Sequence, residues 1–216
     1  MDPISVLVID DHPLAFYAIK EALTREYPGS VFVSARNAAE GLDHFRAGKF
    51  DLIILDLSLG GRSGLEVLDD IRHHSATVPV LIMSAYPEQL YGVRSLRAGA
   101  SGYLRKDAAM TDILYAVSQL LAGKKYISSA LAQDLAMFVS DDSQRPAHER
   151  LSRREFEVLC LIGKGFSVKQ IASQLNLSIK TVSTYRTRIL TELNLDTTAA
   201  LIRFCLEYKL LDDELS

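Results

Sequence analysis

The sequence predicts an α/β domain with a doubly wound, five-stranded parallel sheet, followed by an all-α helix-turn-helix domain. Up to about residue 123, short β-rich apolar runs alternate with amphipathic helical stretches, which is typical of a parallel sheet covered on both faces. After about residue 150 only helical patterns remain. A polar stretch at 140–149 lacks any apolar period and separates the two patterns. We therefore expect a first domain at 1–123, a linker at 124–149 and a second domain at 150–216.

Each expected element follows from its own run of residues. The strands are apolar runs of four to six residues, at 4–9, 31–35, 52–55, 80–83 and 102–105. Amphipathic helical patterns follow them at 13–26, 38–46, 65–73, 88–98 and 111–122. A further helix at 129–139 could pack on either domain. The second domain has helical patterns at 153–162, 168–174, 179–193 and 198–208.

The bulk composition excludes several classes of protein. With 216 residues and 48% apolar content, the chain can bury two small cores. Charged or polar groups interrupt every apolar stretch well before the roughly 20 residues of a membrane span, and no targeting segment opens the chain. We expect a soluble, cytoplasmic protein without a membrane partner. Cys160 and Cys205 are interpreted as core residues. The net charge of −3 does not indicate nucleic-acid binding, so a DNA-binding face must be local.

Polar side chains follow four of the expected strands at the point where each strand ends. They are Asp10 and Asp11 after the first strand, Asp56 after the third, Ser84 after the fourth and Lys106 after the fifth. In an open parallel sheet, ligands bind outside the carboxyl ends of the strands. Carboxylates packed closely repel one another, and a hard divalent cation with oxygen ligands relieves that repulsion. The pattern therefore predicts a Mg²⁺ site.

With the metal screening its charge, one carboxylate could attack phosphorus and carry an acyl phosphate. Asp56 is the expected nucleophile because it stands alone after an apolar strand, whereas the adjacent pair Asp10 and Asp11 suits metal binding. Lys106 would neutralise one phosphoryl oxygen, and the Ser84 hydroxyl could donate to another. The competing interpretation is that strand-end Asp and Ser residues merely cap the following helices. Considered by itself, Tyr103 is interpreted as a packed aromatic residue.

A helix in the second domain is predicted to read DNA. A tight turn at 176–178 leads into this helix, and the hydroxyl of Ser178 is its expected N-cap. The buried side of the helix is marked by Val182, Ile189 and Leu193. Residues 178–188 include basic side chains and no acidic one, which suits docking in the major groove. A solvated charged face is the competing interpretation. The residues near or on its outer face are Lys180, Thr181, Ser183, Thr184, Tyr185, Arg186, Thr187 and Arg188.

Residues 4 to about 123 resemble the receiver domain of bacterial two-component response regulators, which has a flavodoxin-like fold. The motifs that carry the resemblance are Asp10-Asp11, Asp56, Ser84-Ala85 and Tyr103-Leu104-Arg105-Lys106. It implies phosphotransfer to Asp56 from a histidine kinase or phosphotransfer protein.

The resemblance also implies specific roles within that site. Magnesium would be bound by Asp10, Asp11 and Asp56 beside the backbone carbonyl of Ser58. Ser84 would then turn toward the phosphoryl group while Tyr103 swings inward.

Two positions depart from the receiver pattern. Receivers often have Met-Pro where this chain has Leu59-Gly60, and many have Pro where this chain has Asp107. Gly60-Gly61 should make the loop beside Asp56 more flexible, which bears on the lifetime of a phosphorylated form.

The second domain resembles the LuxR-type DNA-binding domain from residue 151 to about 211. The motifs are Leu151-Ser152-Arg153-Arg154-Glu155, Val158-Leu159, Gly163-Lys164-Gly165, Ile171-Ala172, Lys180-Thr181-Val182-Ser183 and Leu193-Asn194-Leu195. A receiver joined to this domain is similar to the NarL/FixJ class of response regulators. The resemblance implies a four-helix unit that binds double-stranded DNA at paired half-sites as a homodimer on activation. Spacing alone leaves open which of its side chains touch bases.

The leading hypothesis is a phosphorylation-controlled transcription regulator rather than an enzyme. One alternative, a phosphatase with an Asp nucleophile, typically has Asp-x-Asp, whereas Asp56-Leu57-Ser58 has no second acid. Another is a DNA-binding regulator whose first domain only dimerises. The histidines lack metal-ligand spacing and are expected at the surface or at caps; they are His12, His44, His73, His74 and His148.

Overall fold

The computed structural model describes residues 2–59, 62–140, 147–208 and 210–211. The chain divides into two compact units, residues 1–135 and residues 136–216. Each unit has its own core and is described by itself. Among the residues described, none of the helices has both the length and the apolar character needed to cross a membrane.

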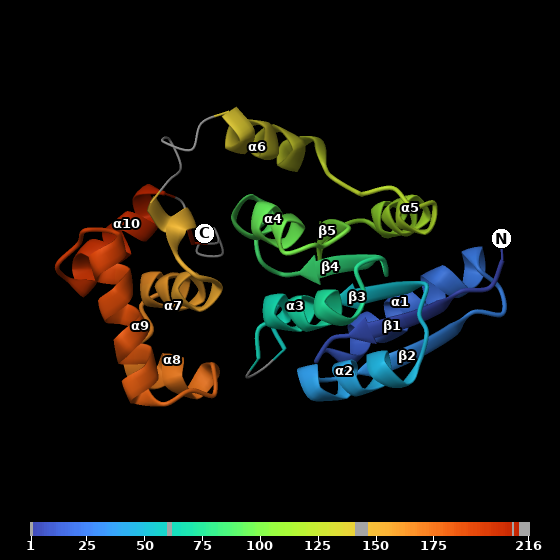
Figure 1. Ribbon diagram of the computed structural model, residues 1–216, viewed down its shortest axis with the longest axis horizontal. Helices are drawn as coiled ribbons and strands as arrows, with labels where there is room; N and C mark the ends of the chain where they lie inside the picture. Colours follow the sequence, from blue (N-terminus) through green and yellow to red (C-terminus); the bar gives the residue numbers. More distant parts are fainter. Residues whose placement is uncertain (1, 60–61, 141–146, 209, 212–216) are drawn as a thin grey trace. The chain divides into compact units, whose positions relative to one another are not determined.

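The first unit contains a five-stranded parallel sheet (Figure 1). Its strands are β1 (Ser5–Ile9), β2 (Val31–Ala35), β3 (Leu52–Leu55), β4 (Val80–Ser84) and β5 (Gly102–Arg105). They lie in the order β2-β1-β3-β4-β5, with every pair parallel. The predicted α/β fold class is confirmed, and the register brings the carboxyl ends of β1, β3, β4 and β5 to one edge of the sheet.

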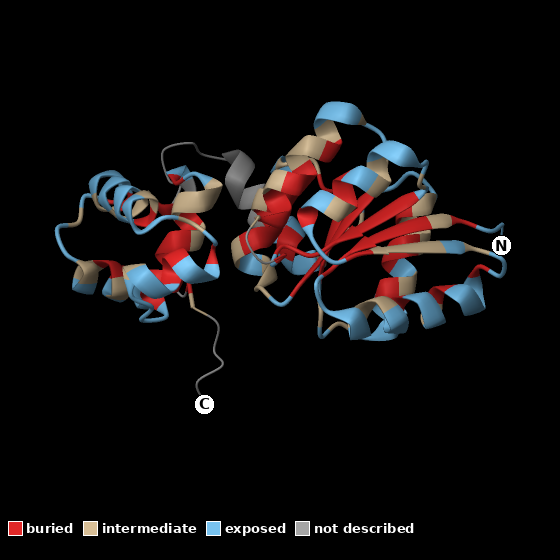
Figure 2. Ribbon diagram, turned by 90° about the horizontal axis from the view of Figure 1, so that it is seen from below, coloured by how far each residue is buried: buried red, intermediate tan, exposed pale blue. Residues whose placement is uncertain are grey.

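Five helices cover this sheet. They are α1 (Pro13–Glu26), α2 (Ala38–Ala47), α3 (Gly64–His74), α4 (Glu88–Arg97) and α5 (Met110–Leu121). Alternate residues of β1 point to opposite faces, so that Val6 and Val8 join the core beneath α1 and α5, where they meet Ile19, Leu23 and Val117. Four strands are buried along most of their length, whereas β2 at the edge of the sheet is mostly half-buried, and the helices expose their outer sides (Figure 2).

Helix α6 (Ser129–Ser140) begins on the first unit. Leu131 in its first turn is fully buried, and the Ser128 hydroxyl just before it donates a hydrogen bond to Glu88 of α4. The sequence left open which domain this helix packs on, and its first turn packs on α4. At the end of the predicted linker, where the sequence predicts a loop, residues 147–150 form a short 3₁₀ helix that reaches the first residue of the second domain. The predicted flexible pair Gly60-Gly61 and residues 141–146 lie outside the described part of the chain.

The second unit is helical, as predicted. Its helices are α7 (Arg153–Gly163), α8 (Val168–Gln174), α9 (Ile179–Glu192) and α10 (Thr198–Glu207), and α7 packs against the other three. Ser152 and Ser167 form capping boxes at the starts of α7 and α8. Asn176 and Asn194, which follow the C-cap residues of α8 and α9, adopt left-handed conformations with φ of 53° and 52°. Asparagine tolerates this conformation, which lets both helices end in tight turns.

Two predictions about single residues have different outcomes. Cys160 and Cys205 are buried thiols, as expected, and the Cys205 thiol donates to the carbonyl of Leu159. The expectation that all histidines lie at the surface or at caps is wrong for His148. This residue is only 9% exposed, and its ring packs against the rings of Phe156 and Tyr208. A lone histidine in a polar stretch gave no sign that distant aromatic residues would cover it.

Gly64 at the start of α3 allows the closest backbone approach beside Asp56. Its amide donates a hydrogen bond to the carbonyl of Leu57, and a Cβ added there would lie 2.1 Å from the backbone oxygen of Asp56. Since this oxygen belongs to the main chain, a side chain at position 64 can be accommodated only if β3 and α3 move apart.

We therefore expect Gly64→Ala to lower the free energy of unfolding by about 3 kcal/mol or more, from overpacking against backbone. Gly123→Ala is the matched control, because a Cβ there meets nothing within 4 Å. Its φ of 76° should make that change cost about 1 kcal/mol. Urea unfolding of both variants measures the difference, and equal destabilisation of the two would show that the close approach does not limit position 64.

Candidate functional site

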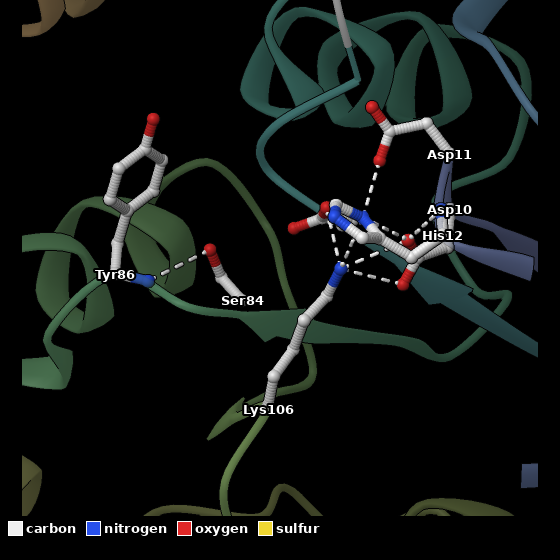
Figure 3. Close-up of polar contacts among 7 residues, drawn as sticks. Asp10, Asp11, His12, Ser84, Tyr86 and Lys106 are labelled. Carbon is white, nitrogen blue, oxygen red and sulfur yellow. Dashed lines mark hydrogen bonds and ion pairs between the residues drawn. The ribbon is translucent and has the colours of Figure 1, made fainter. Parts of the chain in front are cut away.

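Two of the predicted strand-end carboxylates, those of Asp10 and Asp56, meet at the ammonium group of Lys106, and Figure 3 shows Lys106 beside Asp10 and His12. Lys106 Nζ lies 2.8 Å from Asp10 Oδ2 and 2.9 Å from Asp56 Oδ2. Asp10 and Asp56 are 6% and 2% exposed, whereas Asp11 lies at the surface. Oxygen atoms of all three carboxylates, together with a ring nitrogen of His12, lie within 4.8 Å of one another.

Burial and charge oppose each other at Asp56. Burial raises the pKa of its carboxyl group, while the hydrogen bond and charge of Lys106 and the amide of Ser58 lower it. The balance leaves the pKa raised, so the ionised form is not fully compensated by its protein partners. Burial alone would lower the pKa of Lys106, but its hydrogen bonds and charge pairs with Asp10 and Asp56 outweigh that effect and raise it.

The residues around Asp56 fit a divalent cation. Asp56 Oδ1 is buried and has no hydrogen-bond partner among the described residues, although the side chain is nearly inaccessible to water. An unpartnered carboxylate oxygen in such a position costs free energy unless a ligand occupies its lone pairs. The other atoms that could act as metal ligands here are mainly carboxylate oxygens, which Mg²⁺ prefers. The acidic cluster is thus of the kind that binds Mg²⁺.

Ser84 lies at the neighbouring strand end, and its hydroxyl is turned toward Tyr86 rather than toward Lys106 (Figure 3). Ser84 Oγ accepts a hydrogen bond from the Tyr86 amide at 3.3 Å. The Tyr103 hydroxyl donates to the carbonyl of the same residue at 2.7 Å. Tyr103 is fully buried, and burial raises its pKa. Ser84 and Tyr103 therefore both hold the backbone of Tyr86.

Two positions beside the pocket also have defined surroundings. The backbone amide of Ser58 helps to lower the pKa of the Asp56 carboxyl group, while the Ser58 residue is exposed. Asp107, which departs from the receiver pattern, accepts two hydrogen bonds from Arg105, at 2.9 and 2.8 Å. Those bonds lower the pKa of the Asp107 carboxyl group.

His12 is the residue that the sequence analysis missed. The five histidines lack metal-ligand spacing in the sequence, which predicts surface or capping positions for all of them. In the structure, His12 Nδ1 lies 2.7 Å from Asp11 Oδ1 and 3.3 Å from Asp10 Oδ1. The available signal was its position, directly after Asp10-Asp11 at the end of a strand. It belongs to the rim of the acidic cluster.

Most of the residues that the sequence predicts on the outer side of α9 are exposed, and three of them are partly buried. Val182 and Ile189 are fully buried and Leu193 is 7% exposed. The exposed residues of its outer side are Lys180, Ser183, Thr184, Thr187 and Arg188, and Thr181, Tyr185 and Arg186 are partly buried. Ser178 caps the helix by accepting from the amide of Thr181.

Arg186 has an intramolecular role. Its Nε and Nη2 atoms donate to Thr198 Oγ1 at 2.9 and 2.7 Å, which ties α9 to the start of α10. Among the described residues, the side chains of Lys180 and Arg188 have no hydrogen-bond or ion-pair partner; the carbonyl of Lys180 accepts from the Thr184 hydroxyl. Their charges remain available for a ligand outside the helix, whereas the guanidinium group of Arg186 is already engaged.

Comparison with protein families identifies both units. Residues 6–118 match the model of the response regulator receiver domain. Residues 149–205 match the model of bacterial regulatory proteins of the LuxR family.

Similar proteins extend along nearly the whole chain. Response regulator UvrY of Escherichia coli K12 is 31% identical over 212 residues, which cover 98% of this chain and 97% of UvrY. The putative positive transcription regulator of virulence factors BvgA, from Bordetella pertussis, is 33% identical over 197 residues, which cover 91% of this chain and 94% of BvgA.

Solved structures give the same result. The structure of RcsB from Salmonella enterica serovar Typhimurium bound to promoter P1flhDC with the phosphomimetic BeF₃⁻ is 25% identical. It covers 94% of this chain and 98% of its own, with a TM-score of 0.58. A two-component response regulator of the LuxR family from Aurantimonas is 26% identical, with a TM-score of 0.59, and covers 65% of this chain and all of its own. The names of UvrY and BvgA describe regulators. This chain belongs to the NarL/FixJ class of two-component response regulators, which join a receiver to a LuxR-type DNA-binding domain.

Proposed function

We propose that Asp56 accepts a phosphoryl group from a histidine kinase or phosphotransfer protein and that this event controls DNA binding by α9. The observation that carries the proposal is the asymmetry of the Asp56 carboxylate. Oδ2 is held by Lys106 at 2.9 Å, while the buried Oδ1 has no hydrogen-bond partner among the described residues. One oxygen is thus oriented and the other remains unpaired, which suits a nucleophile fixed in a single pose.

Magnesium is the inferred cofactor, held by Asp10, Asp11 and Asp56 with the backbone carbonyl of Ser58. When bound, it would screen the carboxylates and draw charge from the phosphoryl oxygens. In the transfer, the P–N bond of a phosphohistidine donor breaks as a P–O bond to Asp56 forms. Lys106 stands 2.9 Å from Asp56 Oδ2, so its ammonium group can remain beside that oxygen and neutralise one phosphoryl oxygen.

The output is inferred from the second unit. Lys180 and Arg188 would contact DNA phosphates, and the hydroxyl-bearing residues between them would lie against base edges. We infer that phosphorylated chains pair as homodimers on two half-sites of double-stranded DNA in the cytoplasm. The assignment of 1–123 as the phosphoacceptor domain, 124–149 as linker and 150–216 as the DNA-binding domain belongs to this proposal.

Two alternatives make different predictions. An Asp-nucleophile phosphatase needs an acid two residues after the nucleophile, where this chain has Ser58, so steady turnover of a phosphomonoester is not expected. A first domain that serves only for dimerisation would not need a half-buried Lys106 paired with two buried carboxylates. DNA affinity unchanged by a phosphodonor would favour that second alternative.

The first test is covalent labelling. Asp56→Asn should abolish the gain of one phosphoryl mass when the chain is treated with a small phosphodonor and Mg²⁺, because an amide is not a nucleophile at phosphorus. Asp43→Asn is the control, since Asp43 is 79% exposed and pairs only with Arg46 among the described residues. Intact-mass spectrometry and peptide mapping provide the readout. Equal labelling of the Asp56→Asn variant would show that another residue is the acceptor.

The second test is stabilisation by the metal. Mg²⁺ at about 100 times its dissociation constant should stabilise the chain by about 2.7 kcal/mol, because it binds the folded state only. Burial raises the pKa of Asp56, so this carboxyl group costs no stability below its unfolded pKa, and stability is lost as the pH rises from there through the folded pKa. The metal relieves that cost. The shift in melting temperature should therefore be largest at neutral pH and shrink as the pH falls and the carboxyl group is protonated.

Asp10→Asn should reduce the same shift, and Asp43→Asn should leave it unchanged. A shift that persists in Asp10→Asn, or that grows at acidic pH, would place the bound ion elsewhere.

The third test concerns the DNA-binding face. Lys180→Ala or Arg188→Ala should weaken DNA affinity and reduce the slope of log K against log salt, by about one unit for each phosphate that the variant no longer neutralises. Lys49→Ala, an exposed change in the first unit, is the control. Filter binding or fluorescence anisotropy at several salt concentrations measures the slope. An unchanged slope in both α9 variants would mean that this helix does not lie against the DNA backbone.

A further inference from the structure

Two threonines lie on the exposed side of α9, in line with Lys180. The positions of Lys180, Thr184 and Thr187 follow the spacing i, i+4 and i+7, which places the three residues on one face of the helix. All three are exposed, while Val182 and Ile189 on the opposite side are fully buried. A ligand that docks on Lys180 would therefore also meet the side chains of Thr184 and Thr187.

The hydroxyl groups of both threonines are already used within the helix. Thr184 Oγ1 donates to the carbonyl of Lys180 at 3.0 Å, and Thr187 Oγ1 donates to the carbonyl of Ser183 at 3.1 Å. A hydroxyl group has a single proton to donate, so neither side chain has a further donor to offer. Because the hydroxyl is turned toward the helix backbone, the γ-methyl group on the same Cβ is the part of the side chain left to meet a ligand.

The bases differ in which of these groups they can use in the major groove. Guanine presents only acceptors there, N7 and O6, whereas thymine presents a C5-methyl group that is read by apolar contact. Phosphate oxygens are acceptors as well. A threonine whose proton is engaged can donate to guanine or to phosphate only by giving up its intrahelical hydrogen bond. Its methyl group can pack on the thymine methyl group without that loss.

We propose that Thr184 and Thr187 select thymine in each DNA half-site through contacts between methyl groups, and that their hydroxyl groups do not read bases. This inference rests on the proposed function, because it needs α9 in the major groove. Along the helix axis the two residues lie about 4.5 Å apart, which is close to the rise of about 3.4 Å for one base-pair step. They should therefore read thymines at neighbouring positions of one half-site.

Removal of the thymine methyl group tests the contact directly. The full-length chain, treated with a small phosphodonor and Mg²⁺, first selects duplexes from a random-sequence pool. The selected duplex is then compared with duplexes that carry deoxyuridine in place of single thymidines, which lack only the C5-methyl group. Affinity should fall about fourfold for each methyl group that a threonine covers. The slope of log K against log salt should not change, since no phosphate contact is lost.

Paired variants separate the role of the methyl group from that of the hydroxyl group. Thr184→Ser keeps the hydroxyl and loses the methyl, so its affinity for the thymidine duplex should fall about fourfold. On the duplex with deoxyuridine at the contacted position, the same change should have no further effect, because the contact is already absent. Thr184→Val keeps a methyl group and loses the hydroxyl, so its affinity should fall less than twofold. The corresponding variants of Thr187 should behave alike at the neighbouring position.

Thr24→Ser is the matched control. Thr24 is an exposed threonine of α1 whose hydroxyl donates to the carbonyl of Lys20 at 2.7 Å, so it has the same intrahelical hydrogen bond in the other unit. Loss of its methyl group should leave DNA affinity unchanged on both duplexes. Far-UV circular dichroism and melting temperatures equal to those of the parent chain establish that the α9 variants are folded when their affinities are compared.

The outcomes separate this inference from the proposed function. Loss of affinity in Thr184→Val with full affinity in Thr184→Ser would mean that the hydroxyl group reads the base, and would overturn the inference. Equal affinity for thymidine and deoxyuridine duplexes, with a salt slope reduced in Lys180→Ala, would overturn thymine selection and leave α9 as the DNA-binding helix. A pool in which no sequence is enriched would overturn both proposals.

Discussion

The contact between one lysine and two buried carboxylates is the interaction on which the pocket depends. Lys106 comes from the end of β5, and Asp10 and Asp56 come from the ends of β1 and β3. Without the ammonium group, two negative charges would lie together almost out of contact with water, a highly unfavourable arrangement. The lysine makes the pocket compatible with folding. It does not pair with every carboxylate oxygen, because Asp56 Oδ1 has no hydrogen-bond partner among the described residues. A dication or a phosphoryl group could supply the partner that this oxygen lacks.

This constraint explains why the pocket could be predicted from the sequence. Parallel strands end at a common edge, so Asp10, Asp56 and Lys106 could be expected to meet even though almost a hundred residues separate the first from the last. The strands themselves were recognisable because each is a short, mainly apolar run, and the ends of α1 and α8 were predicted to the residue. Periodicity and strand-end chemistry are local signals, and they carried the fold class and the position of the site.

What could not be predicted depends on contacts between distant residues. Periodicity placed Arg186 among the DNA-facing residues, but its guanidinium group donates hydrogen bonds to Thr198 within the same unit. His148 is covered by rings from α7 and from beyond α10, which no pattern around it reveals. The seat of Leu131 on α4 likewise joins two segments whose own sequences favour helix without naming a partner. In each case the side chain has several plausible environments, and tertiary packing selects one.

Gly64 illustrates how chemistry and architecture become difficult to separate in this pocket. The start of α3 touches the main chain of Asp56 with no room for even a methyl group. A saturation-mutagenesis screen scored only by reporter-gene output would classify this glycine with the acidic residues, as intolerant of every replacement. Its intolerance would have a purely steric origin, and abundance measured in parallel would distinguish a chain that cannot fold from one that folds but cannot signal.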